Sequence, residues 1–263
     1  MDAVIAIGTS GFQYDDWVGP FYPESLPKWE WLSFYAREFG ACELNFTYYR
    51  IPTAKTLTQM SAKVPAGFLF AVKAFQGITH EREGNDAAFP EFAQSLEPLR
   101  GSGQLGCVLL QFPYSFGNTA QNHDYLKLCR DRLSVLPLVV EFRKEDWIQP
   151  QVFDLLRKME MGFCCVDEPR IPRLMPPIAE ATSKIAYVRF HGRNAKKWWN
   201  HEQAWERYDY AYSADELQEW APKIRQLDSV AETTFVFANN HWQAKAVDTA
   251  RQLRLLLGQD AAQ

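Results

Sequence analysis

Two spacings of apolar residues alternate along the chain. Short apolar runs with side chains alternating at period two predict strands, and segments with apolar residues at i, i+3, i+4 and i+7 predict amphipathic helices. Strands are expected at residues 4–7, 41–45, 68–74, 105–111, 138–143, 162–167, 184–191 and 233–238. Helices are expected at residues 28–39, 53–64, 90–99, 122–133, 150–161, 214–227 and 241–257.

The order of these elements predicts the fold class. Strands that alternate with helices form βαβ units and a parallel sheet. Eight strands in a chain of 263 residues fit a single (β/α)8 TIM-type barrel, and a doubly wound open sheet is the alternative. A proline-rich link at residues 169–177 stands where the sixth helix would be, so that helix is expected to be degenerate. No linker or low-complexity segment divides the chain, which predicts one domain over residues 1–263.

Composition narrows the environment and the partners. Hydrophobic residues make up 47% and charged residues 23%, which predicts a large core. The five cysteines include no C-x-x-C pair and lie mostly in apolar runs, as expected in a reducing compartment. We expect a cytoplasmic protein without a membrane segment, because neither a signal-peptide pattern nor an apolar run of about 20 residues occurs. A net charge of −4 disfavours nucleic acid as the partner, although a local basic patch remains an alternative. No feature fixes the oligomeric state.

Polar residues gather at the carboxyl ends of the predicted strands. On strand 184–191, one face carries Ile185, Tyr187, Arg189 and His191, whereas the opposite face is wholly apolar. The other strands repeat this arrangement with Glu43, Asn45, Lys73, Gln111, Glu141, Arg143 and Asp167, and the last strand runs into Asn239 and Asn240. One face of each barrel strand points to the axis, and barrel active sites lie at the carboxyl end. We therefore expect one polar pocket there; a network that only fills the barrel mouth is the alternative.

The charges in this pocket balance. Three acidic residues face three basic residues and a titratable imidazole: Glu43, Glu141 and Asp167 against Lys73, Arg143 and Arg189, with His191. Unpaired buried charge is costly, which predicts a hydrogen-bonded network. Arg189 is expected to be buried against Glu141 or Glu43, with Arg193 more exposed above it.

A small anionic substrate fits these residues best, and a phosphorylated one is an open alternative because many barrels bind phosphate. The arginines that end strand 184–191, and the asparagines at the start of the last helix, would bind an anion; simple helix capping is the other reading of the asparagines. We expect an enzyme with Glu43 or Glu141 as base and His191 as acid. The catalytic candidates are Glu43, Glu141, His191, Lys73 and Asp167. The substrate-binding candidates are Asn45, Gln111, Arg143, Arg189, Arg193, Asn239, Asn240, Tyr14 and Trp17.

Three other chemistries stay open. The acidic residues and the aromatic opening loop would suit a glycosidase, but the ends of the fourth and seventh strands carry Gln111 and Arg189 rather than acids. The acids and His191 would suit a divalent metal, but basic residues compete for them, and no metal ligand is assigned. The basic and aromatic loop at residues 193–200 would stack on nucleic acid or form a lid, and the acidic net charge favours the lid.

Several motifs together resemble the YecE-like family of unknown function, which has a TIM-barrel fold. The matching motifs, which cover nearly the whole chain, are Gly8-Thr-Ser-Gly11 with Tyr14, Trp17, Gly19 and Phe21-Tyr-Pro23; Glu43-Leu-Asn45 with Tyr49-Arg50; Ile78-Thr-His80; Leu110-Gln-Phe-Pro113; Glu141-Phe-Arg143 with Trp147; Val188-Arg-Phe-His-Gly-Arg193; and Asn239-Asn-His241. The chain departs from the family pattern at Phe12, Lys144 and Gln243. The resemblance implies the barrel fold and no established reaction.

Overall fold

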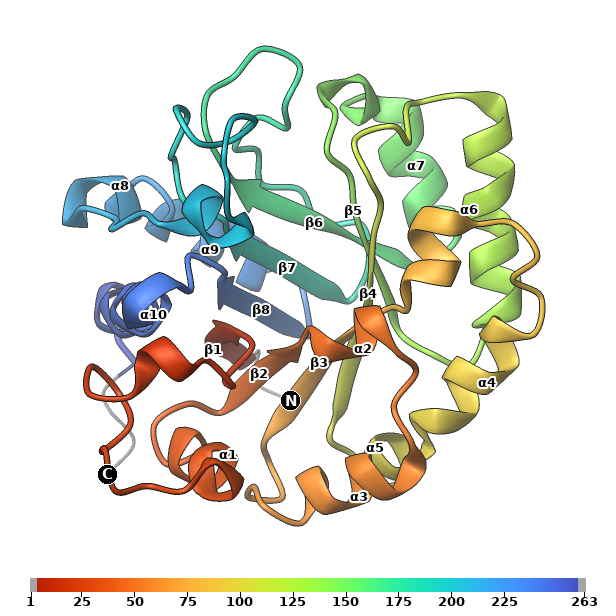
Figure 1. The fold of residues 1–263 in the computed structure, drawn as a ribbon. Coiled ribbons are helices and arrows are strands. Elements are labelled where there is room, and N and C mark those ends of the chain that lie inside the picture. Colours follow the sequence, from red (N-terminus) through yellow and green to blue (C-terminus); the bar gives the residue numbers. More distant parts are fainter. Residues whose placement is uncertain (1–3, 260–263) are drawn as a thin grey trace.

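A computed structural model of the protein describes residues 4–259, and its eight strands close into one parallel barrel (Figure 1). Each strand pairs with the next, and β1 also pairs with β8. The predicted TIM-type barrel is therefore confirmed; the predicted domain of 1–263 includes residues outside the described range. The strands are β1 Val4–Ser10, β2 Ala41–Leu44, β3 Leu69–Lys73, β4 Leu105–Gln111, β5 Leu138–Glu141, β6 Met161–Asp167, β7 Ile185–Phe190 and β8 Thr233–Ala238.

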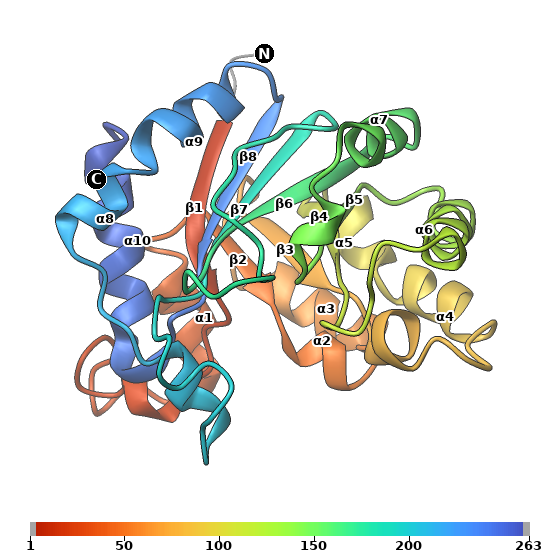
Figure 2. The same ribbon diagram turned by 90° about the horizontal axis from the view of Figure 1, so that it is seen from above.

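Helices surround the strands, and the segment that follows β7 lies at the same end as the carboxyl ends of the strands (Figure 2). The helices are α1 Trp31–Tyr35, α2 Phe46–Tyr49, α3 Ala54–Ser61, α4 Ala88–Ser95, α5 Glu97–Gly101, α6 Ala120–Arg132, α7 Pro150–Lys158, α8 Ala214–Gln218, α9 Ala221–Asp228 and α10 Lys245–Leu256. Within residues 4–259 no helix connects β6 to β7, which confirms the degenerate sixth position. None of the described helices has the length and apolar character needed to cross a membrane.

Several predicted boundaries are wrong for local reasons. The helix expected at residues 214–227 is two helices, because Pro222 at the start of α9 has no N–H to continue the preceding turn. The last helix starts at Lys245 because Gln243 and Ala244 adopt left-handed backbone conformations, with φ of 52° and 60°. β1 continues to Ser10, beyond the predicted end of the strand at residue 7. Gly8 packs directly on β2, because a Cβ there would lie 2.0 Å from the Ala41 carbonyl oxygen.

Aromatic rings fill the lower half of the barrel. The ring of Tyr187 on β7 lies 5.9 and 5.4 Å from the rings of Phe235 and Phe237 on β8. On the opposite wall, Gly106 leaves room for this layer, because a Cβ there would come within 2.4 Å of the Phe235 ring. The barrel is therefore closed below by apolar side chains, and the polar residues of the strand ends lie above them.

Asp167 faces outward from the barrel, which corrects its predicted place in the central pocket. Its fully buried carboxylate accepts hydrogen bonds from Arg193 Nε and Nη2 at 2.9 and 2.8 Å, from Tyr212 Oη at 2.6 Å and from Trp220 Nε1 at 2.7 Å. Arg193 also pairs with Glu219. Arg193 is more exposed than Arg189, as predicted, at 13% against 2%, but it is held in ion pairs rather than free. Together these residues attach the segment between β7 and α9 to the outside of the barrel.

Replacing Arg193 tests this attachment. Arg193→Met removes the only cation that pairs with the Asp167 carboxylate within the described residues. Loss of one partner of a buried ion pair lowers the free energy of unfolding by about 3–5 kcal/mol. Because Tyr212 and Trp220 still donate to the carboxylate, we expect a smaller loss of about 2–3 kcal/mol, measured by denaturant unfolding. The matched control is Arg132→Met, whose partner Asp86 is 82% exposed and which should cost under about 1 kcal/mol. Equal, small losses for both variants would contradict this placement.

Candidate active site

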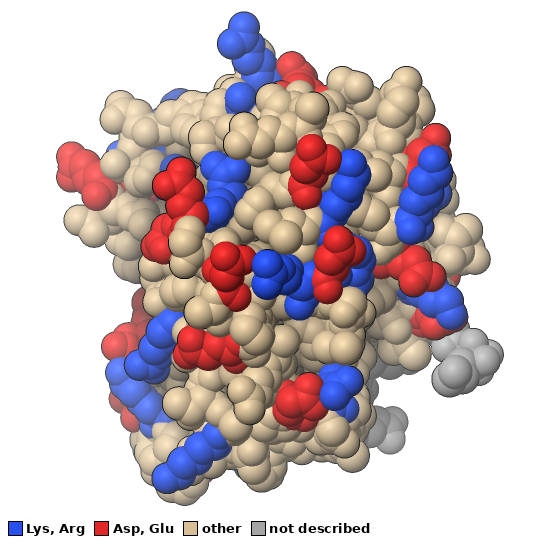
Figure 3. Space-filling view, turned by 90° about the vertical axis from the view of Figure 1, so that its right-hand side faces the viewer, with Lys and Arg blue, Asp and Glu red and all other residues tan. Residues whose placement is uncertain are grey.

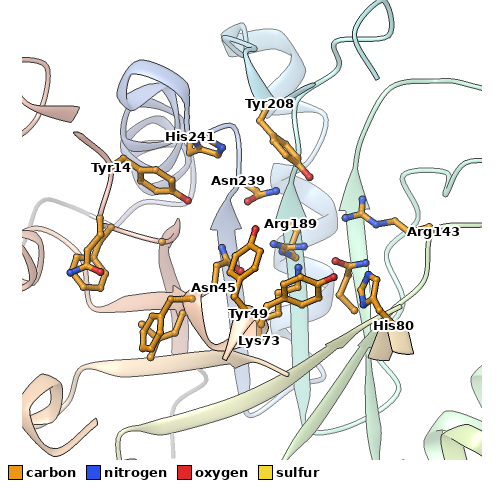
Figure 4. A pocket seen from close by; sticks show the side chains of 17 residues that line it. Tyr14, Asn45, Tyr49, Lys73, His80, Arg143, Arg189, Tyr208, Asn239 and His241 are labelled. Atoms are coloured by element: carbon orange, nitrogen blue, oxygen red, sulfur yellow. The ribbon is translucent and has the colours of Figure 1, made fainter. Parts of the chain in front are cut away.

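A cavity of about 440 Å³ opens at the carboxyl ends of the strands (Figure 4). In this view Arg189 lies between Asn239 and Arg143, with Lys73 below it and Tyr208 above. The wall of the cavity consists mainly of aromatic rings, amides, two imidazoles and three basic side chains. The lining residues are Gly11, Phe12, Gln13, Tyr14, Leu44, Asn45, Phe46, Tyr48, Tyr49, Lys73, His80, Gln111, Arg143, Arg189, Tyr208, Asn239 and His241.

The floor of the cavity is organised by Arg189 at the end of β7. Its guanidinium donates from Nη1 to Glu141 Oε2 at 2.6 Å and from Nη2 to Glu43 Oε1 at 2.7 Å. The second oxygen of Glu43 accepts from the Tyr187 hydroxyl at 2.6 Å. Both carboxylates are fully buried. One planar, permanently charged group therefore joins acidic residues of β2 and β5 across the barrel, as predicted for Arg189.

The ion pairs continue from Glu141 toward β6. Arg143 Nη2 lies 3.1 Å from Glu141 Oε1, and Arg143 Nη1 lies 3.3 Å from Glu168 Oε2. Glu43, Arg189, Glu141, Arg143 and Glu168 thus form an alternating chain of acidic and basic groups. Burial opposes ionisation of Glu141, but Arg189 and Arg143 hold its pKa well below the ordinary value. Glu141 is therefore a fixed anion within this chain.

Glu168 was missed from the sequence, where Asp167 was chosen instead. On β6, Cys164 faces the axis with its Sγ 3.8 Å from Glu141 Oε2, whereas Cys165 contacts the backbone of Glu180 outside the barrel. The inward row therefore ends at Glu168. Burial raises the pKa of Glu168 to about 7, against the opposing effect of Arg143. A fraction of this side chain is protonated near neutral pH.

Lys73 has no such acidic partner. Its Nζ lies 4.4 Å from the centre of the Tyr48 ring, and within residues 4–259 no carboxylate comes within 4 Å and no acceptor hydrogen-bonds it. The inward-facing acids are already bound to Arg189 and Arg143. Burial, together with the nearby Arg189, lowers the pKa of Lys73 to about 7. Both its charged and its neutral forms are therefore populated at neutral pH.

His191 lies beneath the cavity and is held in its neutral form. Its Nε2 donates to Glu141 Oε1 at 3.2 Å, and its Nδ1 accepts from the Asn239 amide at 2.9 Å, an arrangement that fixes one neutral tautomer. Burial lowers the pKa of His191 to about 3 despite the adjacent carboxylate. A group of this kind positions Glu141 and cannot supply a proton near neutral pH, so the geometry does not support His191 as the acid.

Two other histidines line the cavity, His80 and His241, which the sequence presents only as parts of motifs and not as site residues. His80 contacts the Tyr48 ring edge to face at 4.9 Å, and the adjacent Thr79 hydroxyl holds its Nδ1 at 2.9 Å. His241 stacks on Tyr14 at 4.5 Å. Burial lowers the pKa of each to about 4. His80 lies in a short π-helix, Gly77–Glu81, and His241 follows β8. Both lie outside the strands, where strand periodicity gives no signal.

The predicted site residues divide into three groups. Those that line the cavity are Tyr14, Asn45, Lys73, Gln111, Arg143, Arg189 and Asn239. Those buried beneath it are Glu43, Glu141 and His191. Those that lie elsewhere are Asp167, Arg193, Asn240 and Trp17. Asn240 donates to the Tyr210 carbonyl and to Thr249, and Trp17 donates from Nε1 to the His241 carbonyl. Asn240 and Trp17 therefore support the loops that carry the cavity wall.

The loop after β7 covers part of the opening. Tyr208 of this loop lines the cavity, and Trp198 is buried with its ring 6.4 Å from that of His191. A second cavity of about 200 Å³ lies beside the first and shares Gln111 and Arg143 with it. Tyr114 and the 55% exposed Trp199 form its outer wall. This position fits the predicted lid.

A metal would have to displace these ion pairs. Among the residues that the structure describes, no three side chains of His, Cys, Asp or Glu are grouped as metal ligands. Glu43 and Glu141, the strongest candidates from the sequence, share Arg189 instead.

Arg189 should be required for stability. Arg189→Met leaves two buried carboxylates without their shared partner, which costs about 3–5 kcal/mol in denaturant unfolding. Adding Glu43→Gln removes one stranded charge, so the double variant should recover part of the loss. The control Arg100→Met removes an exposed pair with Glu97 and should cost under about 1 kcal/mol. A loss as small as the control's would show that the carboxylates do not depend on Arg189.

The titration of Lys73 should appear in the pH dependence of stability. With a pKa of about 7 when folded and 10.5 when unfolded, the unfolded chain binds more protons between these values, so Lys73 destabilises the fold most at and below pH 7. Lys73→Met should be more stable than the wild type at pH 7, and the difference should shrink toward pH 10. Denaturant melts of both proteins measure it. A difference that stays constant over this range would exclude the lowered pKa.

Comparisons with known proteins agree with the architecture. Residues 6–263 match the model of a family described as "Protein of unknown function DUF72". UPF0759 protein YunF of Bacillus subtilis is 31% identical over 97% of this chain and 95% of its own. Crystal structures of DUF72 family proteins from Thermotoga maritima and Enterococcus faecalis align with TM-scores of 0.89 and 0.86, at 36% and 27% identity; they cover 97% of this chain, and 99% and 96% of their own. The resemblance to the YecE-like family is thereby confirmed, and the chain belongs to the DUF72 family of TIM-barrel proteins, whose function is unknown.

Proposed function

We propose that this protein is an enzyme that binds a small anionic molecule in the central cavity and acts on it by acid–base chemistry. One observation carries the proposal: of the described residues that line the cavity, three are basic and none is acidic. The acidic residues lie beneath the wall, where arginines bind them. The surface offered to a ligand is therefore cationic, although the buried cluster as a whole is nearly neutral.

The charge of Lys73 makes an anionic ligand favourable. A buried cation without a counter-ion is costly, and an incoming anion would supply the missing partner. Asn45 Oδ1 and His241 Nδ1 are also buried on this wall without a hydrogen-bond partner in the described part of the chain. Such groups normally find a partner in a ligand or in ordered water. A cavity of about 440 Å³ suits a small molecule, and a phosphate or carboxylate group fits the arginines equally well.

Lys73 is also the best acid–base group of the site. A general acid or base works best with a pKa near the working pH, and Lys73, at about 7, meets that condition on the cavity wall. Glu43 and Glu141, first considered as bases, are held in ion pairs and do not line the cavity. We therefore assign proton transfer to Lys73 and a supporting role to Glu43 and Glu141.

The alternatives have less support. A glycosidase needs two carboxyl groups that flank the substrate bond, whereas here one guanidinium lies between Glu43 and Glu141. Nucleic-acid binding is favoured only by the exposed Trp199 and its basic neighbours. On the face in Figure 3, basic and acidic side chains are interspersed, unlike the continuous basic surface that tracks a phosphate backbone. Non-catalytic ligand binding would use the same cavity but would need no titrating lysine.

Calorimetric titration with sulfate, phosphate and glycolate tests anion binding. The wild type should bind at least one of them, and Lys73→Met should bind it about 10- to 100-fold more weakly, because a charge-assisted contact contributes about 1.5–3 kcal/mol. Lys127→Met is the matched control, because Lys127 lies on α6, does not line the cavity and forms an exposed pair with Asp124. No binding of any of these anions, or steeply salt-dependent micromolar binding of oligonucleotides instead, would overturn the proposal.

A further inference from the structure

The surroundings of Lys73 suit a nucleophile as well as a base. The side chain projects from the end of β3 into the cavity, and the face of Tyr48 is its nearest described partner. A lysine held for its charge would be expected to touch a carboxylate; here Glu43 and Glu141 are taken by Arg189, and Glu168 by Arg143. The amine therefore faces the ligand space with no competing hydrogen-bond acceptor among the described residues.

We propose that Lys73 forms an imine with a carbonyl compound that carries an anionic group, of the 2-oxo acid type. This inference rests on the proposed function, since it names the substrate class of the same cavity. In Figure 4 Arg189 lies above Lys73, and Arg143 lies to the right of Arg189. All three side chains line the same cavity, so one molecule can present its anionic group to the arginines and its carbonyl carbon to Nζ.

The step needs no further reactant. The lone pair of neutral Nζ attacks the carbonyl carbon, a C–N bond forms, and the oxygen takes a proton to give a carbinolamine. The C–O bond then breaks, and both protons of the amine nitrogen leave in one molecule of water, so that amine and carbonyl become imine and water. Protonation of the imine gives a cation at the former Nζ position, where the face of the Tyr48 ring stabilises positive charge. Such a cation withdraws electrons from adjacent bonds, as in lyase chemistry.

The state of the amine supports this reading. Only a neutral amine is nucleophilic, and about half of Lys73 is neutral at pH 7 if its pKa is about 7. A lysine with an ordinary pKa of 10.5 is neutral in roughly one molecule in three thousand at that pH. Lys127 and Lys184, which lie exposed in ion pairs, provide internal references for lysines on the surface. Lys73 should therefore react at least a hundredfold faster than either.

Reductive trapping tests the imine. The full-length protein is incubated at pH 7 with glyoxylate or pyruvate and sodium cyanoborohydride, and the adducts are located by peptide mass mapping. We expect one adduct per chain, at Lys73, with Lys127 and Lys184 almost unmodified. Lactate, which carries the same anionic group without the carbonyl, should compete with trapping and form no adduct. Lys73→Met should lose the adduct and bind the anion about 10- to 100-fold more weakly. Lys73→Arg should lose the adduct and keep the charge that binds the anion, and thermal melts establish that both variants are folded.

The outcomes separate this inference from the proposed function. If glycolate or sulfate binds but no adduct forms at Lys73, or adducts spread evenly over the exposed lysines, the imine is excluded while anion binding stands. If Lys73 is trapped equally well by acetaldehyde, and lactate does not compete, the imine is supported while the anionic substrate is excluded. If neither binding nor trapping occurs, both are wrong.

Discussion

The shared guanidinium of Arg189 determines what the other charged groups can do. By binding Glu43 and Glu141 together, it occupies the inward-facing acids of β2 and β5 and holds them below the cavity wall. Arg143 does the same for Glu168. Burial of several charges is tolerated because each contacts an opposite one. Among the residues that the structure describes, Lys73 is the inward-facing cation without a counter-ion, because the inward-facing acids already bind Arg189 and Arg143.

Protonation and ligand binding are coupled in such an arrangement. If Glu168 is protonated, the two negative charges of Glu43 and Glu141 equal the two positive charges of the arginines that bind them. A charged Lys73 then gives the cluster a net positive charge. An anion near Lys73 restores the balance and raises the lysine's pKa. By linkage, the anion binds more tightly when Lys73 is charged, and binding draws a proton onto it when it is not. The same residue thus recognises charge and transfers protons.

The sequence predicts the barrel and much of the cavity floor because both depend on strand periodicity. Glu43, Glu141 and Arg189 lie on strands whose two faces differ clearly, so their inward orientation can be deduced. On β6 both faces are apolar and the strand ends in two consecutive acids. The alternation of side chains therefore does not show whether Asp167 or Glu168 points to the barrel axis. His80 lies in the short π-helix Gly77–Glu81 and His241 in the connection after β8, and the course of both segments depends on tertiary contacts. That Lys73 has no carboxylate partner among the described residues could not be predicted, because it depends on how the charged residues of distant strands pair.

Proton uptake on anion binding tests the coupling most directly. Calorimetric titration with sulfate at pH 8, repeated in buffers of different ionisation enthalpy, counts the protons taken up per anion bound. Free Lys73 with a pKa of about 7 is roughly nine-tenths neutral at this pH, so uptake should approach about 0.9 proton in the wild type and vanish in Lys73→Met. Anion binding with no proton uptake in the wild type, or equal uptake in both proteins, would contradict a lone, titrating lysine as the centre of the site.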